Sequence, residues 1–123
     1  MPIIVADLQL GKGSTLLISQ PEIHLHPNVQ AELANYFLNN MLDMNKRYII
    51  ETHSEYLLNR FRYLITKGLI KEEQLNVYYL RNINDKTQTF RIFFKKNGKI
   101  EGAPKDFFDT YMMDVMNIAM TAK

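Results

Sequence analysis

Apolar residues in the first 70 positions alternate between short continuous runs and helical spacings. A continuous apolar run at 15–19 predicts a short strand that is buried on both faces of a parallel sheet, and residues 48–51 predict a second such strand. Between them, apolar residues return at helical spacing over 28–42, and a second helical stripe follows over 57–65. The order strand, helix, strand, helix predicts a parallel sheet with right-handed crossovers.

Glycines and capping residues mark where these elements begin and end. Thr52 lies three residues before Glu55, which is the capping-box spacing and predicts the start of the second helix. Gly68 is placed to end that helix. The glycine-rich segment 11–14 predicts a turn, which follows a short helix over residues 2–10.

The pattern changes after residue 70. Residues 75–80 and 89–94 are rich in aromatic and β-branched side chains, so they predict two strands with a turn at 82–85. We expect these strands to form an antiparallel hairpin on the edge of the parallel sheet. Asn97 and Gly98 predict a second tight turn before a short extended segment near residue 100.

A C-terminal helix is expected over residues 105–120, where a methionine-rich stripe is typical of core or subunit contacts. The whole pattern predicts a single three-layer α/β domain. In it, residues 1–70 form an α/β core with a mainly parallel sheet, and residues 71–123 add the β-hairpin and the C-terminal helix. An open sheet edge and an exposed apolar face favour self-association, so we expect a homodimer or a higher oligomer.

Composition narrows the classes of protein only slightly. The chain has 123 residues, a formal net charge of +2 and no cysteine, which excludes disulfides and cysteine-based zinc sites. Its apolar runs are far shorter than the roughly 20 residues of a membrane span, and no basic region precedes the first one. We therefore expect a cytoplasmic protein. The small charge does not by itself point to a nucleic-acid partner.

All three histidines follow predicted strands. His24 and His26 come after the first strand, and His53 comes after the second. Because ligands of open parallel sheets bind at the carboxyl ends of the strands, these loops are expected to share one edge of the domain. Histidine and carboxylate are suitable metal ligands, so one hypothesis is a metal-dependent hydrolase with Glu22 or Glu51 as a further ligand. A His-x-His pair alone is a weak motif, however.

A second interpretation comes from a resemblance that covers almost the whole chain. Residues 16–22 occupy the frame of a Walker B segment, in which a buried strand is followed by two usually acidic positions and a proline. Together with 23–27, 49–54 and 55–60, this segment resembles the bacterial AAA/ABC-class ATPases. These are relatives of the overcoming-lysogenization-defect nucleases and, more distantly, of SMC and double-strand-break-repair ATPases. The similarity ends near 103–109, which resembles that family's C-terminal Trp-Pro-x-Gly-Phe-Phe-Asp segment.

The resemblance implies a partial P-loop NTPase-like fold, with ATP and magnesium as cofactors. By this resemblance, Ser19 stands at the Walker B acid and Gln20 at the carboxylate that orients the attacking water. Glu22 is retained as an acidic residue and is a candidate for holding magnesium. His53 matches the switch histidine that touches the γ-phosphate. The remaining nucleotide-facing or partner-facing positions that the resemblance implies are His24, His26 and Thr52.

The sequence departs from the family pattern mainly in the residues that would bind the phosphates and the magnesium ion of a nucleotide. The sequence contains no G-x-x-x-x-G-K-S/T segment, and Ser19 cannot supply a carboxylate to a magnesium shell. In the C-terminal motif, Ala103 and Asp106 replace the Trp and the Gly. We therefore expect an ATPase-like domain that does not hydrolyse ATP alone and that works with a subunit supplying the phosphate-binding loop.

One alternative is that the chain is a fragment of an active, full-length ATP-hydrolysing protein, for which the resemblance implies a role in DNA transactions or defence. The metal-dependent hydrolase is the other. Whether Met1 is the natural start decides between the first alternative and the leading hypothesis.

Overall fold

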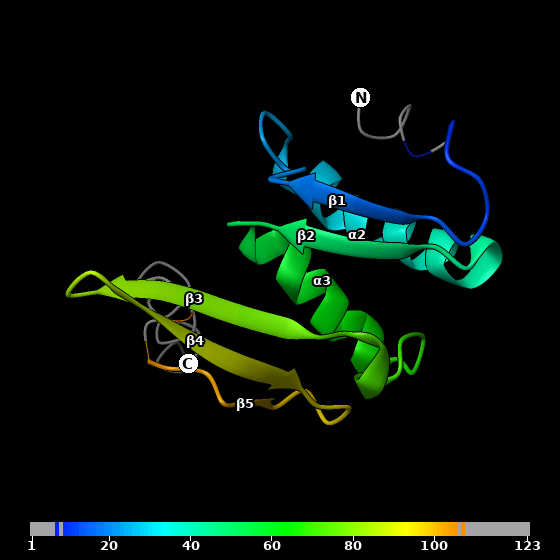
Figure 1. The fold of residues 1–123 in the computed structure, drawn as a ribbon. Coiled ribbons are helices and arrows are strands. Elements are labelled where there is room, and N and C mark those ends of the chain that lie inside the picture. The colour runs from blue at the N-terminus through cyan, green and yellow to red at the C-terminus, as the bar shows by residue number, and fades with distance from the viewer. Residues whose placement is uncertain (1–6, 8, 106, 108–123) are drawn as a thin grey trace. The chain divides into compact units, whose positions relative to one another are not determined.

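The computed structural model describes residue 7, residues 9–105 and residue 107 of the 123-residue chain. The chain divides into two compact units, Met1–Leu64 and Ile65–Lys123, and each is described by itself. Figure 1 shows the helices and strands of both units. Among the helices of the described residues, none is both long and apolar enough to cross a membrane.

The first unit confirms the predicted order of strand, helix, strand and helix. Its elements are β1 (Thr15–Ser19), α2 (Pro27–Met44), β2 (Arg47–Glu51) and α3 (Glu55–Thr66), whose last residues belong to the second unit. β1 and β2 run parallel and in register, so that the first residue of each strand pairs with the first of the other and the last with the last. The predicted turn at residues 11–14 is also present.

The ends of the helices follow from their capping residues. His26 is the N-cap of α2, and Pro27 occupies the first helical turn, where its missing N–H costs nothing. The prediction that Thr52 caps α3 is wrong, because the Ser54 Oγ accepts the Leu57 N–H at 3.1 Å. Gly68 lies two residues after the end of α3 and terminates it as predicted, since it has a φ of +75° and its N–H donates to the Ile65 carbonyl of the last turn.

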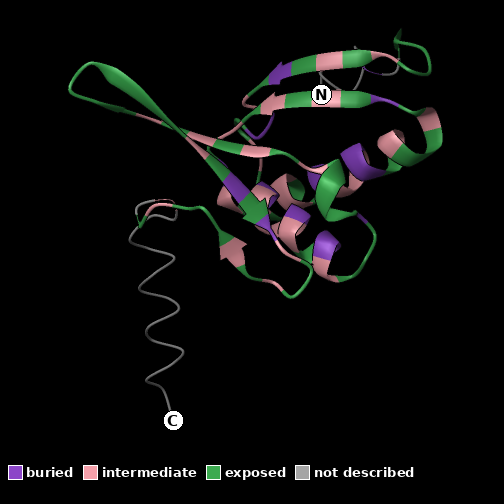
Figure 2. Ribbon diagram, turned by 60° about the horizontal axis from the view of Figure 1, so that its bottom comes forward, coloured by how far each residue is buried: buried purple, intermediate pink, exposed green. Residues whose placement is uncertain are grey.

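The two faces of the β1–β2 sheet differ in burial. On one face the Phe37 ring of α2 packs against the Tyr48 ring, with 4.8 Å between the ring centroids, and Ile18 is buried. On the opposite face Leu17 and Ile49 are neighbours in register and are 74% and 60% exposed. The expectation of strands buried on both faces is therefore wrong for this unit, where α2 covers one face only. Figure 2 shows the resulting alternation of colours along both strands.

The apolar core of the first unit comes mainly from the two helices. The buried side chains recur at helical spacing, as the sequence predicts, and belong to α2 and α3: Leu33, Ala34, Phe37, Leu38, Leu57, Phe61 and Leu64. Val29, one of the apolar residues in the predicted helical stripe over 28–42, is 41% exposed. The buried stripe instead includes Ala34, which has no exposed surface.

A buried ionic cluster joins residue 7 to α2 and β2. The Asp7 side chain has no exposed surface, and its Oδ1 lies 2.9 Å from the Lys46 Nζ. Its Oδ2 accepts hydrogen bonds from the Tyr36 hydroxyl at 2.6 Å, the Tyr48 hydroxyl at 2.7 Å and the Asn40 amide at 3.0 Å. Lys46 also donates to the Asp7 carbonyl oxygen at 2.6 Å. We call these five residues the Asp7 cluster.

The cluster keeps Asp7 ionised and its two phenols neutral. Burial raises the pKa of the Asp7 carboxyl, but the hydrogen bonds from Tyr36, Tyr48 and Lys46 and the charge of Lys46 outweigh it, so this pKa lies below its ordinary value. Burial and the hydrogen bond to Asp7 raise the pKa of Tyr36 to about 12, and the same causes raise the pKa of Tyr48. The charge of Asp7 is thus matched by one ammonium group and three neutral donors.

The second unit contains an antiparallel sheet. A short 3-10 helix, η1 (Glu72–Gln74), precedes β3 (Val77–Ile83), β4 (Lys86–Phe94) and β5 (Ile100–Glu101), which are adjacent in that order. The hairpin is longer than predicted, because the chain reverses over only two residues. These are Asn84 and Asp85, which both have positive φ, as tight hairpin turns require.

Two expectations about this half of the chain need comment. The hairpin was expected to extend the parallel sheet, but the described strands form two separate sheets, one parallel and one antiparallel. The short third strand near residue 100 is confirmed. The expected helix at 105–120 lies almost wholly outside the described residues, and so does most of the expected helix at 2–10, of which Asp7 and Gln9 are helical.

Substitution of Lys46 tests the Asp7 cluster. Lys46→Met leaves the Asp7 carboxylate buried beside neutral donors only, so we expect a loss of about 3–5 kcal/mol in the free energy of unfolding. Urea unfolding followed by circular dichroism measures it. Lys12→Met, on the exposed turn, is the matched control and should change stability by less than about 0.5 kcal/mol. Equal stability of the two variants would contradict the assignment.

A second prediction concerns the close approach of β5 to β4. Gly102 has a φ of +80°, and a Cβ at this position would lie 2.4 Å from the Arg91 carbonyl oxygen. Gly102→Ala should therefore lower the free energy of unfolding by about 1–3 kcal/mol or more. At Gly11 a Cβ would meet no atom within 4 Å, so Gly11→Ala should be almost neutral in the same urea titration. A neutral Gly102→Ala would show that the strands are not this close.

Candidate functional site

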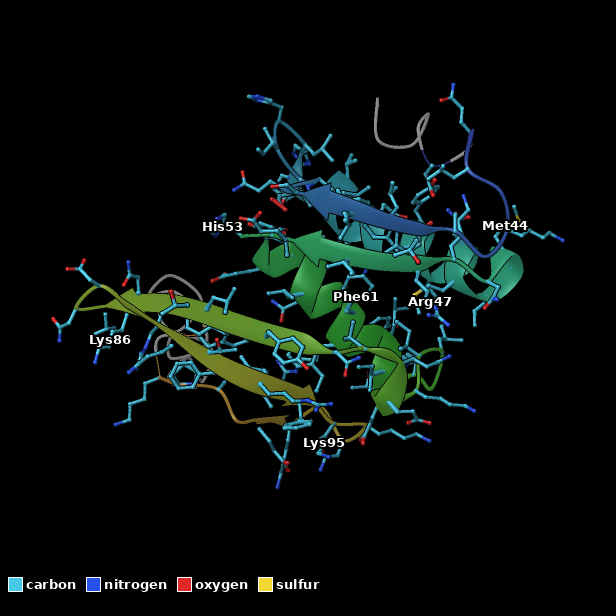
Figure 3. All side chains as sticks on the ribbon, in the orientation of Figure 1. Met44, Arg47, His53, Phe61, Lys86 and Lys95 are labelled. Atoms are coloured by element: carbon cyan, nitrogen blue, oxygen red, sulfur yellow. The ribbon has the colours of Figure 1, made fainter. Side chains whose placement is uncertain are left out.

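The carboxyl ends of β1 and β2 meet at one edge of the first unit. Because the strands are in register, Ser19 and Glu51 are paired, and the Ser19 hydroxyl donates to the Glu51 Oε2 at 2.9 Å. The Gln20 N–H continues the pairing with a 2.7 Å hydrogen bond to the Glu51 carbonyl oxygen. Figure 3 shows His53 just beyond the end of β2, at the same edge. The loops after the two strands are thus neighbours, as the sequence predicts.

The loop after β1 folds back on itself in two tight turns. Gln20 and His24 both have left-handed backbone conformations, with φ of 49° and 64°. The Ile23 N–H donates to the Gln20 carbonyl, and the Leu25 N–H donates to the Glu22 carbonyl. Left-handed φ is uncommon for residues other than glycine, and such residues are found at ligand sites when the surrounding structure holds them in place.

Glu22 and Thr52 connect the two loops. The Glu22 side chain is buried, and one of its carboxylate oxygens accepts a hydrogen bond from the Thr52 hydroxyl. The Thr52 oxygen in turn accepts the Ser54 N–H at 3.0 Å. The buried Glu22 carboxyl group is therefore held in one orientation by a residue of the other strand's loop.

Ser54 provides a second connection. Its hydroxyl donates to the Gln30 Oε1 at 2.6 Å while it caps α3, and the Gln30 amide donates to the Leu25 carbonyl at 2.9 Å. Gln30 lies in the first turns of α2, so this chain of bonds ties the starts of both helices to the loop after β1. The starts of both helices therefore help to hold the loop after β1 in place.

The histidines have separate environments. His26 is exposed and caps α2 through its Nδ1, which accepts the Asn28 N–H at 3.4 Å. His24 and His53 are exposed as well. Among the described residues, which include all three histidines, no group of three or more His, Cys, Asp or Glu side chains could hold a metal ion. The histidine-based metal centre therefore has no support in this part of the chain.

Gln30, which the sequence analysis left out, takes part in this edge, and so does Glu51, which was expected only as a possible metal ligand. Glu51 places a carboxylate beside Ser19, and Gln30 links Ser54 to the loop. The sequence signal for Glu51 is that it ends the second predicted strand, as Ser19 ends the first. Gln30 had no such signal, because its role depends on the packing of α2 beside the loop.

The oxygen donors at this edge suit magnesium. Magnesium bound with a nucleotide is usually held by one or two protein oxygens, with phosphate oxygens and waters completing the shell. The Ser19 hydroxyl and the exposed Glu51 carboxylate lie 2.9 Å apart, on the open face of the sheet. Glu22 is buried and bonded to Thr52, which makes it less available as a direct ligand. Ser19 and Glu51 thus fit this role together.

Comparisons with known proteins agree with this geometry. Residues 5–58 match the family model described as an AAA ATPase domain. The match supports a relationship to AAA-class ATPases. The matched residues include β1, β2, both of their loops and the start of α3, which are the elements that build this edge. No curated protein matches the chain, and no solved structure matches it.

Substitution of Ser54 tests the bracing of the edge. Ser54→Ala removes the α3 cap and the bond to Gln30, so we expect a loss of about 0.5–2 kcal/mol in the free energy of unfolding. Ser14→Ala is a matched control, because the Ser14 hydroxyl is buried and has no hydrogen-bond partner among the described residues. This control should be neutral or slightly stabilising. Chemical denaturation of both variants gives the comparison, and a larger loss in Ser14→Ala would contradict it.

Proposed function

We propose that this chain is an ATPase-like domain of the AAA class that provides the magnesium- and γ-phosphate-facing edge of a nucleotide site and does not hydrolyse ATP alone. The observation that carries the proposal is the pairing of Ser19 with Glu51 at the carboxyl ends of two parallel strands. Nucleotides bind at this edge in open α/β sheets. The family match over residues 5–58 covers the same elements.

Glu51 replaces the carboxylate that the position of Ser19 lacks. In the proposed site, Ser19 and Glu51 hold magnesium together with phosphate oxygens, and the bound ion would neutralise charge on the transferring phosphate. In this site Glu22 does not contact the ion directly, and it instead orients the Thr52 hydroxyl. An ionised Glu51 can do what the usual Walker B acid does, although it belongs to the neighbouring strand.

Gln20 and His53 are placed to contact the rest of the nucleotide. Gln20 is half-buried at the start of the loop, and His53 is exposed just past β2. An amide can orient a water molecule by hydrogen bonding, and an imidazole can donate to a γ-phosphate oxygen. A carboxamide is not a general base, so Gln20 at this position is consistent with weak or absent hydrolysis.

The phosphates need a further binding element. The sequence has no G-x-x-x-x-G-K-S/T segment, and we propose that a partner subunit supplies it. Leu17 and Ile49 form an exposed apolar pair on the same sheet face as Ser19 and Glu51. An element that covers this pair would bring its own groups next to the magnesium-binding oxygens. Self-association through the same face is the corresponding proposal for a homo-oligomer.

Nucleotide binding tests the proposal. Titration of the chain with a fluorescent ATP analogue should show weak binding that strengthens with magnesium, and phosphate release should stay at background. Glu51→Gln removes the charged magnesium ligand and should reduce the magnesium-dependent part of the affinity by at least about tenfold.

Glu32→Gln is the matched control, because Glu32 is an exposed residue of α2 whose carboxylate accepts a hydrogen bond from Asn35 of the same helix. It should bind the analogue as the unchanged chain does. Robust magnesium-dependent hydrolysis by the isolated chain would refute the claim that it is incompetent. Equal effects of Glu51→Gln and Glu32→Gln would refute the role of Glu51.

A further inference from the structure

The two faces of the β3–β4–β5 sheet differ in chemistry. One face carries Ile92 and Phe94, which are almost fully buried. Alternate residues of the same strands point to the other side, where Tyr78 pairs in register with Arg91 and Leu80 pairs with Thr89. We call this side, with Tyr78, Leu80, Arg91 and Phe93, the outer face.

Large apolar and aromatic side chains are exposed on the outer face. Tyr78 is 56% exposed, Leu80 is 62% exposed and Phe93 is 41% exposed. Three such side chains on one small sheet form an apolar patch of the kind that marks an interaction site. In Figure 2 exposed positions alternate with less exposed ones along most of β3 and along the second half of β4.

A guanidinium group lies between the two aromatic rings. The Arg91 Cζ is 5.0 Å from the centroid of Phe93 and 6.0 Å from the centroid of Tyr78, and the Lys95 Nζ is 5.6 Å from the centroid of Phe93. Arg91 also donates to the neutral Asn76 amide oxygen at 3.1 Å, which holds its planar group in place. Aromatic rings and a fixed guanidinium plane both offer stacking surfaces for nucleobases.

The charge of this part of the chain favours an anionic partner. Residues 65–123 contain ten Lys and Arg against seven Asp and Glu, whereas residues 1–64 contain five against six. The overall charge of +2 therefore conceals an asymmetry between the two units. Figure 3 shows Lys95 at the end of β4 away from the hairpin turn, where it lies beside the Phe93 ring. Lys86, at the turn, is an odd number of residues from Arg91 and so belongs to the other face of the strand.

Two carboxylates limit this positive charge locally. Glu101 pairs with Phe93 at the margin of the outer face, and Glu72 lies 3.7 Å from the Lys95 Nζ. Arg91 is thus the cation most centrally placed among the rings. A basic surface with aromatic side chains between its cations is typical of proteins that bind single strands by stacking and backbone contacts.

We infer that the outer face of the β3–β4–β5 sheet binds single-stranded nucleic acid, with bases stacked on Tyr78, Arg91 and Phe93 and the backbone near the lysines of the β4–β5 turn. A duplex does not expose the faces of its bases, so it cannot make these contacts. This function is independent of the nucleotide site proposed for the first unit.

Fluorescence anisotropy with a labelled oligothymidylate of about 15 nucleotides tests the inference on the full chain at low salt. The single strand should bind more tightly than a duplex of equal length, and added salt should weaken it. Tyr78→Ala and Phe93→Ala should each weaken binding about tenfold, because each removes one stacking surface. Arg91→Lys keeps the charge but loses the planar group, so it should also weaken binding.

Matched variants separate stacking from folding and from charge alone. Tyr78→Phe and Phe93→Tyr keep a ring and should bind within about twofold of the unchanged chain, since stacking needs only the π-face. Tyr56→Ala removes an exposed aromatic residue of α3 and should bind normally. Circular dichroism verifies that each variant is folded.

Four results would overturn the inference. The first is absence of any binding at low salt, which would exclude a nucleic-acid partner at this surface. The others are equal affinity for the duplex, unchanged binding by both Tyr78→Ala and Phe93→Ala, and displacement of the oligonucleotide by polyglutamate as effective as by unlabelled single strand. The last result would show that the outer face recognises negative charge without reading bases.

Discussion

The in-register pairing of two five-residue parallel strands determines where the polar chemistry of the first unit lies. Because β1 and β2 begin and end together, their last residues, Ser19 and Glu51, face each other and both loops leave from one edge. A shift of one residue in this register would move the side chains of one strand to the opposite face. It would separate the hydroxyl from the carboxylate and turn Leu17 or Ile49 toward α2. The candidate site therefore depends on strand register more than on any single side chain.

The register has support on the covered face of the same sheet. Tyr48 packs on Phe37 with its ring and bonds to Asp7 with its hydroxyl, so one side chain joins the apolar layer to the buried ionic cluster. Lys46 directly precedes β2 and is fixed by the Asp7 carboxylate. These interactions leave little freedom for β2 to slide. The Asp7–Lys46 ion pair beside the start of β2 thus helps to fix the pairing of Ser19 with Glu51 at its end.

How far the sequence predicts this structure depends on the range of the interactions involved. Features set by continuous apolar runs and by glycines were predictable, because these signals act locally. They are the limits of β1, the start of β2 within one residue, the end of α3 near Gly68 and the turn before β5. The capping of α3 was predicted at the wrong residue, since Thr52 is drawn to Glu22 and Ser54 takes its place.

Interactions between distant residues were not predictable from pattern. Asp7 and Lys46 are 39 residues apart, and neither has a motif that indicates a buried pair. The division into two sheets was missed for a similar reason, because strand propensity does not say which strands will pair. In the candidate site, the loops were expected at one edge, whereas the partners of Glu22 and Ser54 became evident only in three dimensions. Family resemblance supplied the proposed roles of Ser19 and His53, which no local pattern indicates.

The Asp7 cluster also sets a limit on how the chain can be shortened. Its only carboxylate comes from residue 7, while the ammonium group, the two phenols and the amide come from α2, β2 and the residue before β2. A truncation that removes residue 7 would leave the buried Lys46 ammonium group and three half-buried hydrogen-bond donors without this acceptor. Trimming for crystallisation or for fusion to another protein should therefore keep this aspartate, even though it lies near the start of the chain.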